Sequence, residues 1–169
     1  MNRSGDAAGR VHRAYTWGRD GQIHYRRSGP AGARSPLLLL HATQSSGAPY
    51  EAFMSEMGRE RSVIAPDLPG AGMSDPLKNG ADAAAQAGAM LEVVAELGLG
   101  MVDVIGIKDG GVIAVEMARQ QPEVVRKIVL VAAPAPGGLL SQPTLALDQP
   151  GFPEGSEAQA GAIRDFLDN

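Results

Sequence analysis

The amino-acid sequence predicts an α/β fold: a mostly parallel sheet with helices on both faces and an antiparallel hairpin at its N-terminal edge. Apolar runs at residues 36–41, 62–66, 102–107 and 126–132 are too short for helices and lack polar alternation, which is typical of strands covered on both sides. Segments with helical spacing separate these runs. Strand and helix in alternation, repeating every 30 residues or so, specify right-handed crossovers between parallel strands.

The N-terminal hairpin is indicated by its turn. Residues 11–17 and 22–27 flank Gly18-Arg19-Asp20-Gly21, and an Asp-Gly step tolerates the positive φ angles of tight hairpin turns. The first contact in the sheet is therefore expected to be antiparallel.

The helices are indicated by apolar stripes. Pro49 can begin the first helix, and Gly98 and Gly100 end the second. The third spans residues 110–121 and stops at Pro122. Two weaker signals follow Pro136, a short strand at 144–147 and a terminal amphipathic helix. The stripe residues of the first, second and terminal helices are Tyr50, Phe53, Met54 and Met57; Ala87, Met90, Leu91 and Val94; and Ala160, Ile163, Phe166 and Leu167.

Composition bounds the function. The chain has 169 residues, 44% of them apolar, which predicts one domain over residues 11–169 behind a flexible N-terminus of residues 1–10. With a net charge of −4, the chain has no excess of positive charge with which to bind the phosphate backbone of a nucleic acid. The absence of cysteine excludes disulfides, zinc thiolates and a cysteine nucleophile, and three histidines leave little for a metal, so no metal or cofactor is expected. No apolar run reaches the ~18 residues of a membrane span, and we expect a cytoplasmic protein that binds no membrane.

A ligand site is expected at the carboxyl ends of the parallel strands, because loops and helix N-termini converge there. Three loops follow predicted strands, at residues 41–47, 67–76 and 106–111.

These loops carry the motifs of a known family. A buried strand ends at His41-Ala42, residues 66–75 read PDLPGAGMSD, and residues 106–111 read GIKDGG before a helix. In this order the chain resembles the α/β-hydrolase superfamily from about residue 21 to residue 134. Phe152-Pro153-Glu154 and residues 162–167 are similar to the family's C-terminal end. Between these two parts there is no room for a lid and two strands, so the resemblance predicts a truncated α/β-hydrolase-like domain.

The resemblance places Lys108 at the nucleophile position, where the family carries Ser, Asp or Cys. Gly106 and Gly110 satisfy the small-residue spacing of a strained strand-to-helix elbow. A shift of one residue would make Asp109 the nucleophile, but would put Ile107 where a side chain does not fit. Lysine can attack a carbonyl only when desolvation favours its neutral amine, and the sequence shows no such device.

The triad is incomplete in this chain. The family order is nucleophile, acid, then histidine. Asp148 follows the strand at 144–147, where the acid would lie, but the last histidine is His41. Without an imidazole to carry protons, we expect weak or no hydrolysis of esters and amides.

The resemblance also implies an oxyanion pocket at His41-Ala42-Thr43, formed by the backbone N–H groups of Thr43 and Asp109. His41 either belongs to this pocket or fixes the loop by hydrogen bonds. Ser74 and Asp75 either form a Ser–acid pair or cap backbone N–H groups before Pro76.

Three functions stay open. The first is a protein related to ester and amide hydrolases that takes a small acyl-type molecule. The second is a non-catalytic partner module that forms a homodimer through an exposed sheet edge at residues 126–132, left uncovered by the missing strands. The third is imine chemistry at Lys108.

Overall fold

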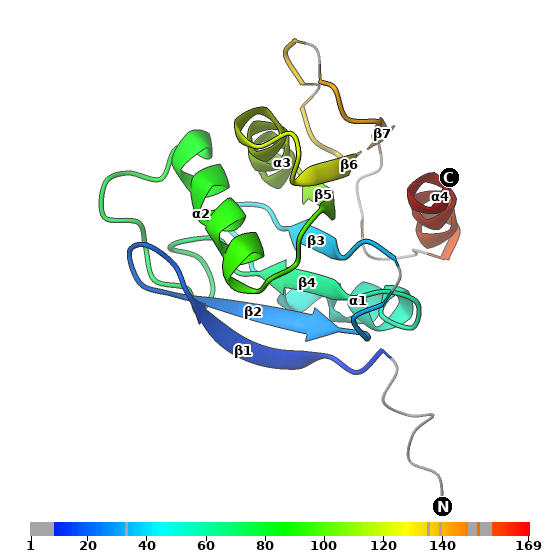
Figure 1. Cartoon of the computed structure of the whole chain (residues 1–169), viewed down its shortest axis with the longest axis horizontal. Coiled ribbons are helices and arrows are strands. Elements are labelled where there is room, and N and C mark those ends of the chain that lie inside the picture. The colour runs from blue at the N-terminus through cyan, green and yellow to red at the C-terminus, as the bar shows by residue number, and fades with distance from the viewer. Residues whose placement is uncertain (1–8, 33, 135, 139, 149–151, 153–156) are drawn as a thin grey trace, which may run out of the picture.

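One mixed sheet organises the chain (Figure 1). The computed structural model describes residues 9–32, 34–134, 136–138, 140–148, 152 and 157–169; most of the predicted flexible N-terminus, and Pro153 and Glu154 of the C-terminal resemblance, lie outside them. Within the described residues, seven strands form the sheet in the order β1-β2-β4-β3-β5-β6-β7.

The strand directions confirm the prediction of an antiparallel hairpin followed by parallel strands. β1 (His12–Trp17) pairs antiparallel with β2 (Gln22–Ser28), and β2 pairs antiparallel with β4 (Val63–Pro66). The other pairings are parallel. They join β4 to β3 (Leu37–Leu40), then to β5 (Val102–Ile107), β6 (Val125–Val131) and β7 (Thr144–Leu147). The carboxyl ends of the parallel strands therefore share one edge, which the elbow occupies.

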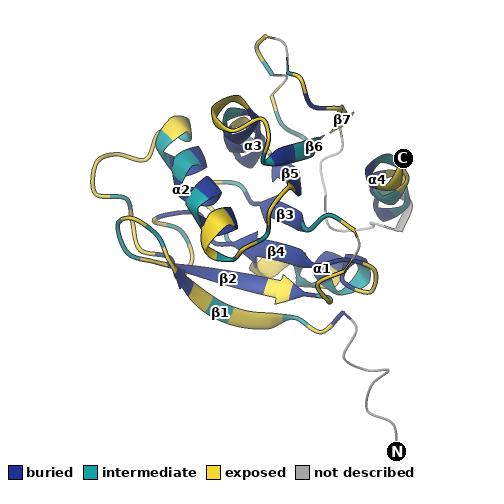
Figure 2. Ribbon diagram, in the orientation of Figure 1, coloured by how far each residue is buried: buried dark blue, intermediate teal, exposed yellow. Residues whose placement is uncertain are grey.

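Helices cover both faces of the sheet (Figures 1 and 2). On one face lie α2 (Ala83–Glu96) and α3 (Asp109–Gln120), packed on a core that includes Leu38, Leu40, Val104 and Ile128. On the other lie η1 (Ala48–Tyr50), α1 (Glu51–Met57) and α4 (Glu157–Asp168). Alternate residues of each strand face the two cores, which explains why the central strands read as unbroken apolar runs.

The terminal helix is fixed to the sheet at its last turn. Ile163 and Leu167 of α4 are buried in the core on the α1 face. Arg126 donates to the carbonyl of Leu167 at 2.8 Å, and Lys127 donates to the carbonyl of Phe166 at 2.8 Å. Cations at a helix C-terminus satisfy its last carbonyls and favour its dipole. The predicted terminal helix is therefore present and anchored.

The prediction of an exposed edge at residues 126–132 is wrong. β7 pairs parallel with β6 from Ile128 to Val131 and covers that edge. Leu145 and Leu147 hold the short strand, because both pack against the core on the α1 face while Thr144 and Ala146 stay exposed. The free edge on this side of the described sheet belongs to β7.

Candidate active site

The turn between β5 and α3 is the strained elbow that the motif predicts. Lys108 has φ 52° and ψ −123°, a conformation that costs a non-glycine residue energy. Its side chain is exposed and forms no hydrogen bond or ion pair with any described residue. Asp109 begins the helix and lacks the positive φ, so the elbow residue is Lys108 and not Asp109.

Close packing imposes the elbow. A Cβ on Gly106 would lie 2.4 Å from Cα of Gly111, and one on Gly110 would lie 2.5 Å from the carbonyl oxygen of Leu40. Neither contact is with a movable side chain, so the start of α3 can approach β5 and the end of β3 only where these residues are glycine. The elbow spacing read from the sequence therefore has a steric cause.

The predicted oxyanion pocket contains a carboxylate of the chain itself. The N–H of Thr43 donates to Oδ1 and Oδ2 of Asp109 at 3.1 and 3.2 Å. The carboxylate thus takes the first of the two N–H groups that were expected to receive a substrate oxyanion. The same charge, together with burial, raises the pKa of Tyr50, burial being the larger cause.

His41 fixes two loops, as the second of its two predicted roles requires. Its Nδ1 lies 2.7 Å from the carbonyl oxygen of Ala42, and its Nε2 accepts the N–H of Leu68 at 2.9 Å. These partners assign the proton to Nδ1 of a neutral ring. Burial lowers the pKa of His41, which keeps that neutral form. Both ring nitrogens are thereby used, and neither is left for proton transfer.

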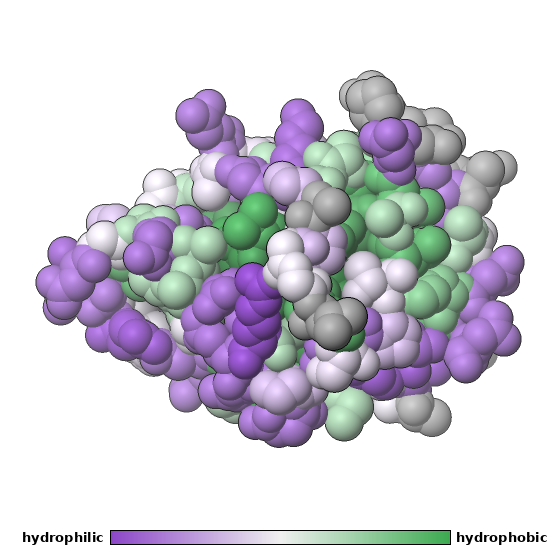
Figure 3. Space-filling view, turned by 90° about the horizontal axis from the view of Figure 1, so that it is seen from above, coloured by the Kyte–Doolittle hydropathy of each residue, from purple (hydrophilic) through white to green (hydrophobic). Residues whose placement is uncertain are grey.

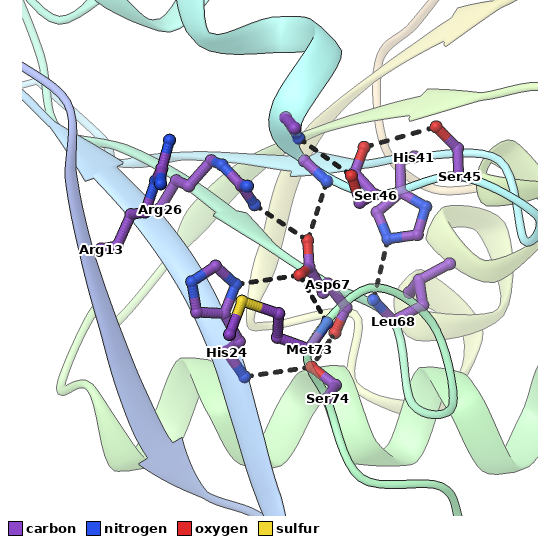
Figure 4. Close-up of polar contacts among 12 residues, drawn as sticks. Arg13, His24, Arg26, His41, Ser45, Ser46, Asp67, Leu68, Met73 and Ser74 are labelled. Carbon is purple, nitrogen blue, oxygen red and sulfur yellow. Dashed lines mark hydrogen bonds and ion pairs between the residues drawn. The ribbon is translucent and has the colours of Figure 1, made fainter.

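Asp67 is the centre of a buried network that the sequence did not reveal (Figure 4). Its carboxylate accepts the N–H groups of Gly47 at 2.8 Å and Met73 at 3.1 Å, and contacts His24 Nδ1 at 2.9 Å and Arg26 at 3.1 Å. Burial opposes ionisation, but the two N–H donors with His24 and Arg26 outweigh it and hold the pKa of Asp67 below its ordinary value. The sequence signals were the position of this acidic residue directly after a buried strand and its place in the PDLPGAGMSD motif, and neither identified its partners.

Ser74 and Asp75 cap backbone N–H groups, as the second interpretation predicts, but these N–H groups belong to β2 and not to the turn before Pro76. Ser74 Oγ accepts the N–H of His24 at 3.0 Å and donates to the carbonyl of Asp67 at 2.7 Å. Asp75 accepts the N–H of Gln22 at 2.8 Å. Each side chain joins the 67–76 loop to the antiparallel hairpin, so the pair is engaged in structure.

Asp148 lies at the end of β7, on the same edge of the sheet as Lys108. Its side chain is exposed and forms no hydrogen bond or ion pair with any described residue. The predicted acid therefore lies at the carboxyl edge of the parallel strands, but no described residue orients its side chain. Among the described residues no group of three or more His, Asp or Glu side chains is placed to hold a metal ion, and no helix is long and apolar enough to cross a membrane.

Known proteins share this arrangement. The model of the alpha/beta hydrolase fold family matches residues 35–164. The chain belongs to this family.

Individual relatives of this α/β-hydrolase chain are longer than it is. An uncharacterised protein of Mycobacterium tuberculosis is 31% identical over 130 residues, which cover 77% of this chain and 37% of that protein. A soluble epoxide hydrolase of a Corynebacterium species is 33% identical over 101 residues, covering 60% and 35% of the two chains. A solved N-acyl homoserine lactonase, in complex with N-hexanoyl homoserine, matches with a TM-score of 0.68 and 33% identity over 74% of this chain and 46% of its own. The chain thus spans less than half of each of these proteins.

The steric origin of the α/β-hydrolase elbow is testable with Gly110→Ala. We expect it to lower the free energy of unfolding by at least about 2 kcal/mol, because the added Cβ meets backbone. Gly161→Ala is the control: it lies in α4 with open space around it and should stabilise the protein by about 0.5 to 1 kcal/mol. Both substitutions raise helix propensity, so urea denaturation of the pair isolates the crowding. Equal stability of the two variants would refute the packing argument.

The role of Asp67 predicts a dependence on pH. Because its pKa is lowered in the folded state, the carboxylate stabilises the fold above the ordinary aspartate pKa of 3.8, and this contribution is lost as pH falls through the folded pKa. Asp67→Asn should therefore cost about 3 kcal/mol at neutral pH, where Arg26 loses a buried partner, and progressively less in acid. Urea unfolding across pH measures both. Asp165→Asn is the control at an exposed site and should change the free energy of unfolding by less than about 0.5 kcal/mol. A loss of stability in Asp67→Asn that is the same at every pH would contradict the role assigned to the ionised carboxylate.

Proposed function

We propose that this chain is an α/β-hydrolase relative that takes a small acyl-type molecule above the elbow and hydrolyses esters and amides weakly or not at all. The observation that carries the proposal is the residue at the elbow: the strained position holds the exposed amine of Lys108.

An ammonium group has no lone pair with which to attack a carbonyl. It becomes a nucleophile only after it loses a proton, and a desolvated site favours that loss. The side chain of Lys108 is exposed, and its amine has no hydrogen-bond partner among the described residues. The surroundings that would activate it are missing from this part of the fold.

No histidine of the chain is placed to act as the base. His41 uses both ring nitrogens in loop contacts. His24 lies on β2 and contacts Asp67, and His12 begins β1; β4 and β3 separate both strands from β5. Asp148 therefore has no imidazole to orient, and proton transfer by a triad is not available within this chain.

The carboxylate of Asp109 further disfavours acyl transfer. A tetrahedral oxyanion at Thr43 would have to displace that carboxylate or lie beside its negative charge. Neutral acyl ligands do not carry this penalty. The lactonase that matches this chain was solved with an N-acyl homoserine, which supports an acyl-type ligand here; because this chain spans less than half of that protein, the ligand is part of the proposal.

The test is hydrolysis of p-nitrophenyl acetate by the wild-type chain and by Lys108→Ala and Lys108→Ser. We expect all three to match the rate in buffer, because the serine variant still lacks a base. Lys108 is exposed, so the variants should keep the stability of the wild type to within about 0.5 kcal/mol. Turnover by the wild type that disappears in Lys108→Ala would overturn the proposal. Trapping of a carbonyl compound on Lys108 by borohydride would support imine chemistry instead.

A second candidate function is a partner module that forms a homodimer through β7. The carbonyls of Pro143 and Leu147 accept bonds from β6, so the alternate residues Thr144 and Ala146 direct their backbone groups away from the sheet. The strand carries no charge, and charges are a common protection of edges. Figure 3 shows apolar surface on the side of the molecule where β7 and α4 lie.

Light scattering over a range of concentrations tests the dimer. Ala146→Pro removes an N–H that points away from β6, so it should abolish association without unfolding the monomer. Ala146→Ser keeps the N–H and should still associate. A wild-type monomer at every concentration would exclude this candidate.

A further inference from the structure

A cavity lies at the end of the sheet opposite the elbow. Its volume is about 260 Å³, which is the share of about nine water molecules in the liquid. The walls come from the carboxyl end of β2, the amino end of β4 and the turn after α2. Tyr25, Ser62 and Ile64 are buried residues of the lining, whereas Arg27 is exposed and Leu97 and Leu99 are half-buried. None of these residues takes part in the site at the elbow.

Two of the eleven described arginines, Arg10 and Arg27, form no ion pair with a described residue, and of these two only Arg27 lines the cavity. Nine of the described arginines form an ion pair with a carboxylate: Arg13, Arg19, Arg26, Arg34, Arg59, Arg61, Arg119, Arg126 and Arg164. The side chain of Arg27 forms no ion pair or hydrogen bond with a described residue, and no aspartate or glutamate is among the residues that line the cavity. Its charge is therefore not neutralised within the described part of the chain.

The lining also contains a buried polar group without a partner. Ser62 is 3% exposed, and its hydroxyl makes no hydrogen bond with any residue that the structure describes. A buried hydroxyl without a partner costs about 1 to 3 kcal/mol, so most such groups in folded proteins are paired. The oxygen is buried in the present rotamer, and rotation of this short side chain about χ1 would turn it toward the cavity that Ser62 lines, where a ligand atom would pair it.

Most of the remaining lining is apolar. Ile64 is part of it, and Leu97 and Leu99 border the cavity where α2 ends. A cavity with one cation, the hydroxyl-bearing residues Ser62 and Tyr25, and aliphatic walls matches a molecule with an anionic head and a short apolar body. Inorganic phosphate would satisfy the cation but leave the aliphatic walls unused.

We propose that this cavity binds a small amphipathic monocarboxylate, with its carboxylate at Arg27 and Ser62 and its chain against Leu97 and Leu99. A hydrogen bond from a guanidinium to a carboxylate is stronger than one between neutral groups, so Arg27 supplies most of the affinity. The site is independent of Lys108 and of the function proposed for the elbow.

Calorimetric titration of the full chain with hexanoate tests the proposal. We expect saturable binding of one equivalent to the wild type, weakened roughly tenfold or more in Arg27→Gln. Arg10→Gln is the matched control, because Arg10 is an exposed arginine with no described partner that lies outside the cavity lining, and its affinity should equal that of the wild type. Arg27 is itself exposed, so its variant should fold, which circular dichroism verifies.

Ser62→Ala supplies an independent readout. Without ligand it should raise the melting temperature, because it removes a buried hydroxyl that has no partner, whereas it should weaken hexanoate binding. Phosphate in place of hexanoate should bind far more weakly. The proposal is overturned if hexanoate does not saturate, if Arg27→Gln binds like the wild type, or if phosphate binds as well as hexanoate.

Discussion

The close crossing of β5 and α3 is the constraint on which the elbow edge of the molecule depends. The contacts of 2.4 and 2.5 Å that a Cβ would make at Gly106 and Gly110 leave one path for the chain between strand and helix. That path forces the positive φ of Lys108 and sets the first turn of α3 beside the loop after β3. The contact of Asp109 with Thr43 follows directly from this placement. Packing of two backbones thus decides which side chains meet at the carboxyl edge.

Buried polar contacts then join the loops of this edge into one unit. Asp67 connects the loop after β3, through Gly47, to its own loop and to β2, while His41 connects the same two loops through Leu68. A carboxylate that accepts several N–H groups is stabilised as an anion, and its removal leaves each donor buried without a partner. Charge-assisted hydrogen bonds therefore act together with the apolar packing of Leu68 to hold the shape of these loops.

The sequence predicted most of the fold because its signals are local. Four apolar runs, an Asp-Gly turn and the helical stripes each specify an element within a few residues, and the structure has all of these elements. The strand at residues 144–147 was predicted, but the expectation that the edge of β6 is exposed was wrong. Four residues show too little periodicity to reveal that Leu145 and Leu147 pack on the core and that their strand covers β6. The polar contacts of the site escaped prediction for another reason. Asp109 and Thr43 are 66 positions apart and Asp67 and His24 are 43 apart, and such pairs exist only once the sheet order is known.

The elbow shows which of its residues the packing of the fold constrains. The glycines around Lys108 are required by packing, so their substitution affects the stability of the whole domain. The side chain between them points into solvent and touches no described partner, so its identity affects stability little. Selection for folding alone therefore maintains the glycine spacing and leaves the central residue free to change. A glycine-bracketed elbow is consequently strong evidence for the fold, and the residue that it lifts decides the chemistry separately.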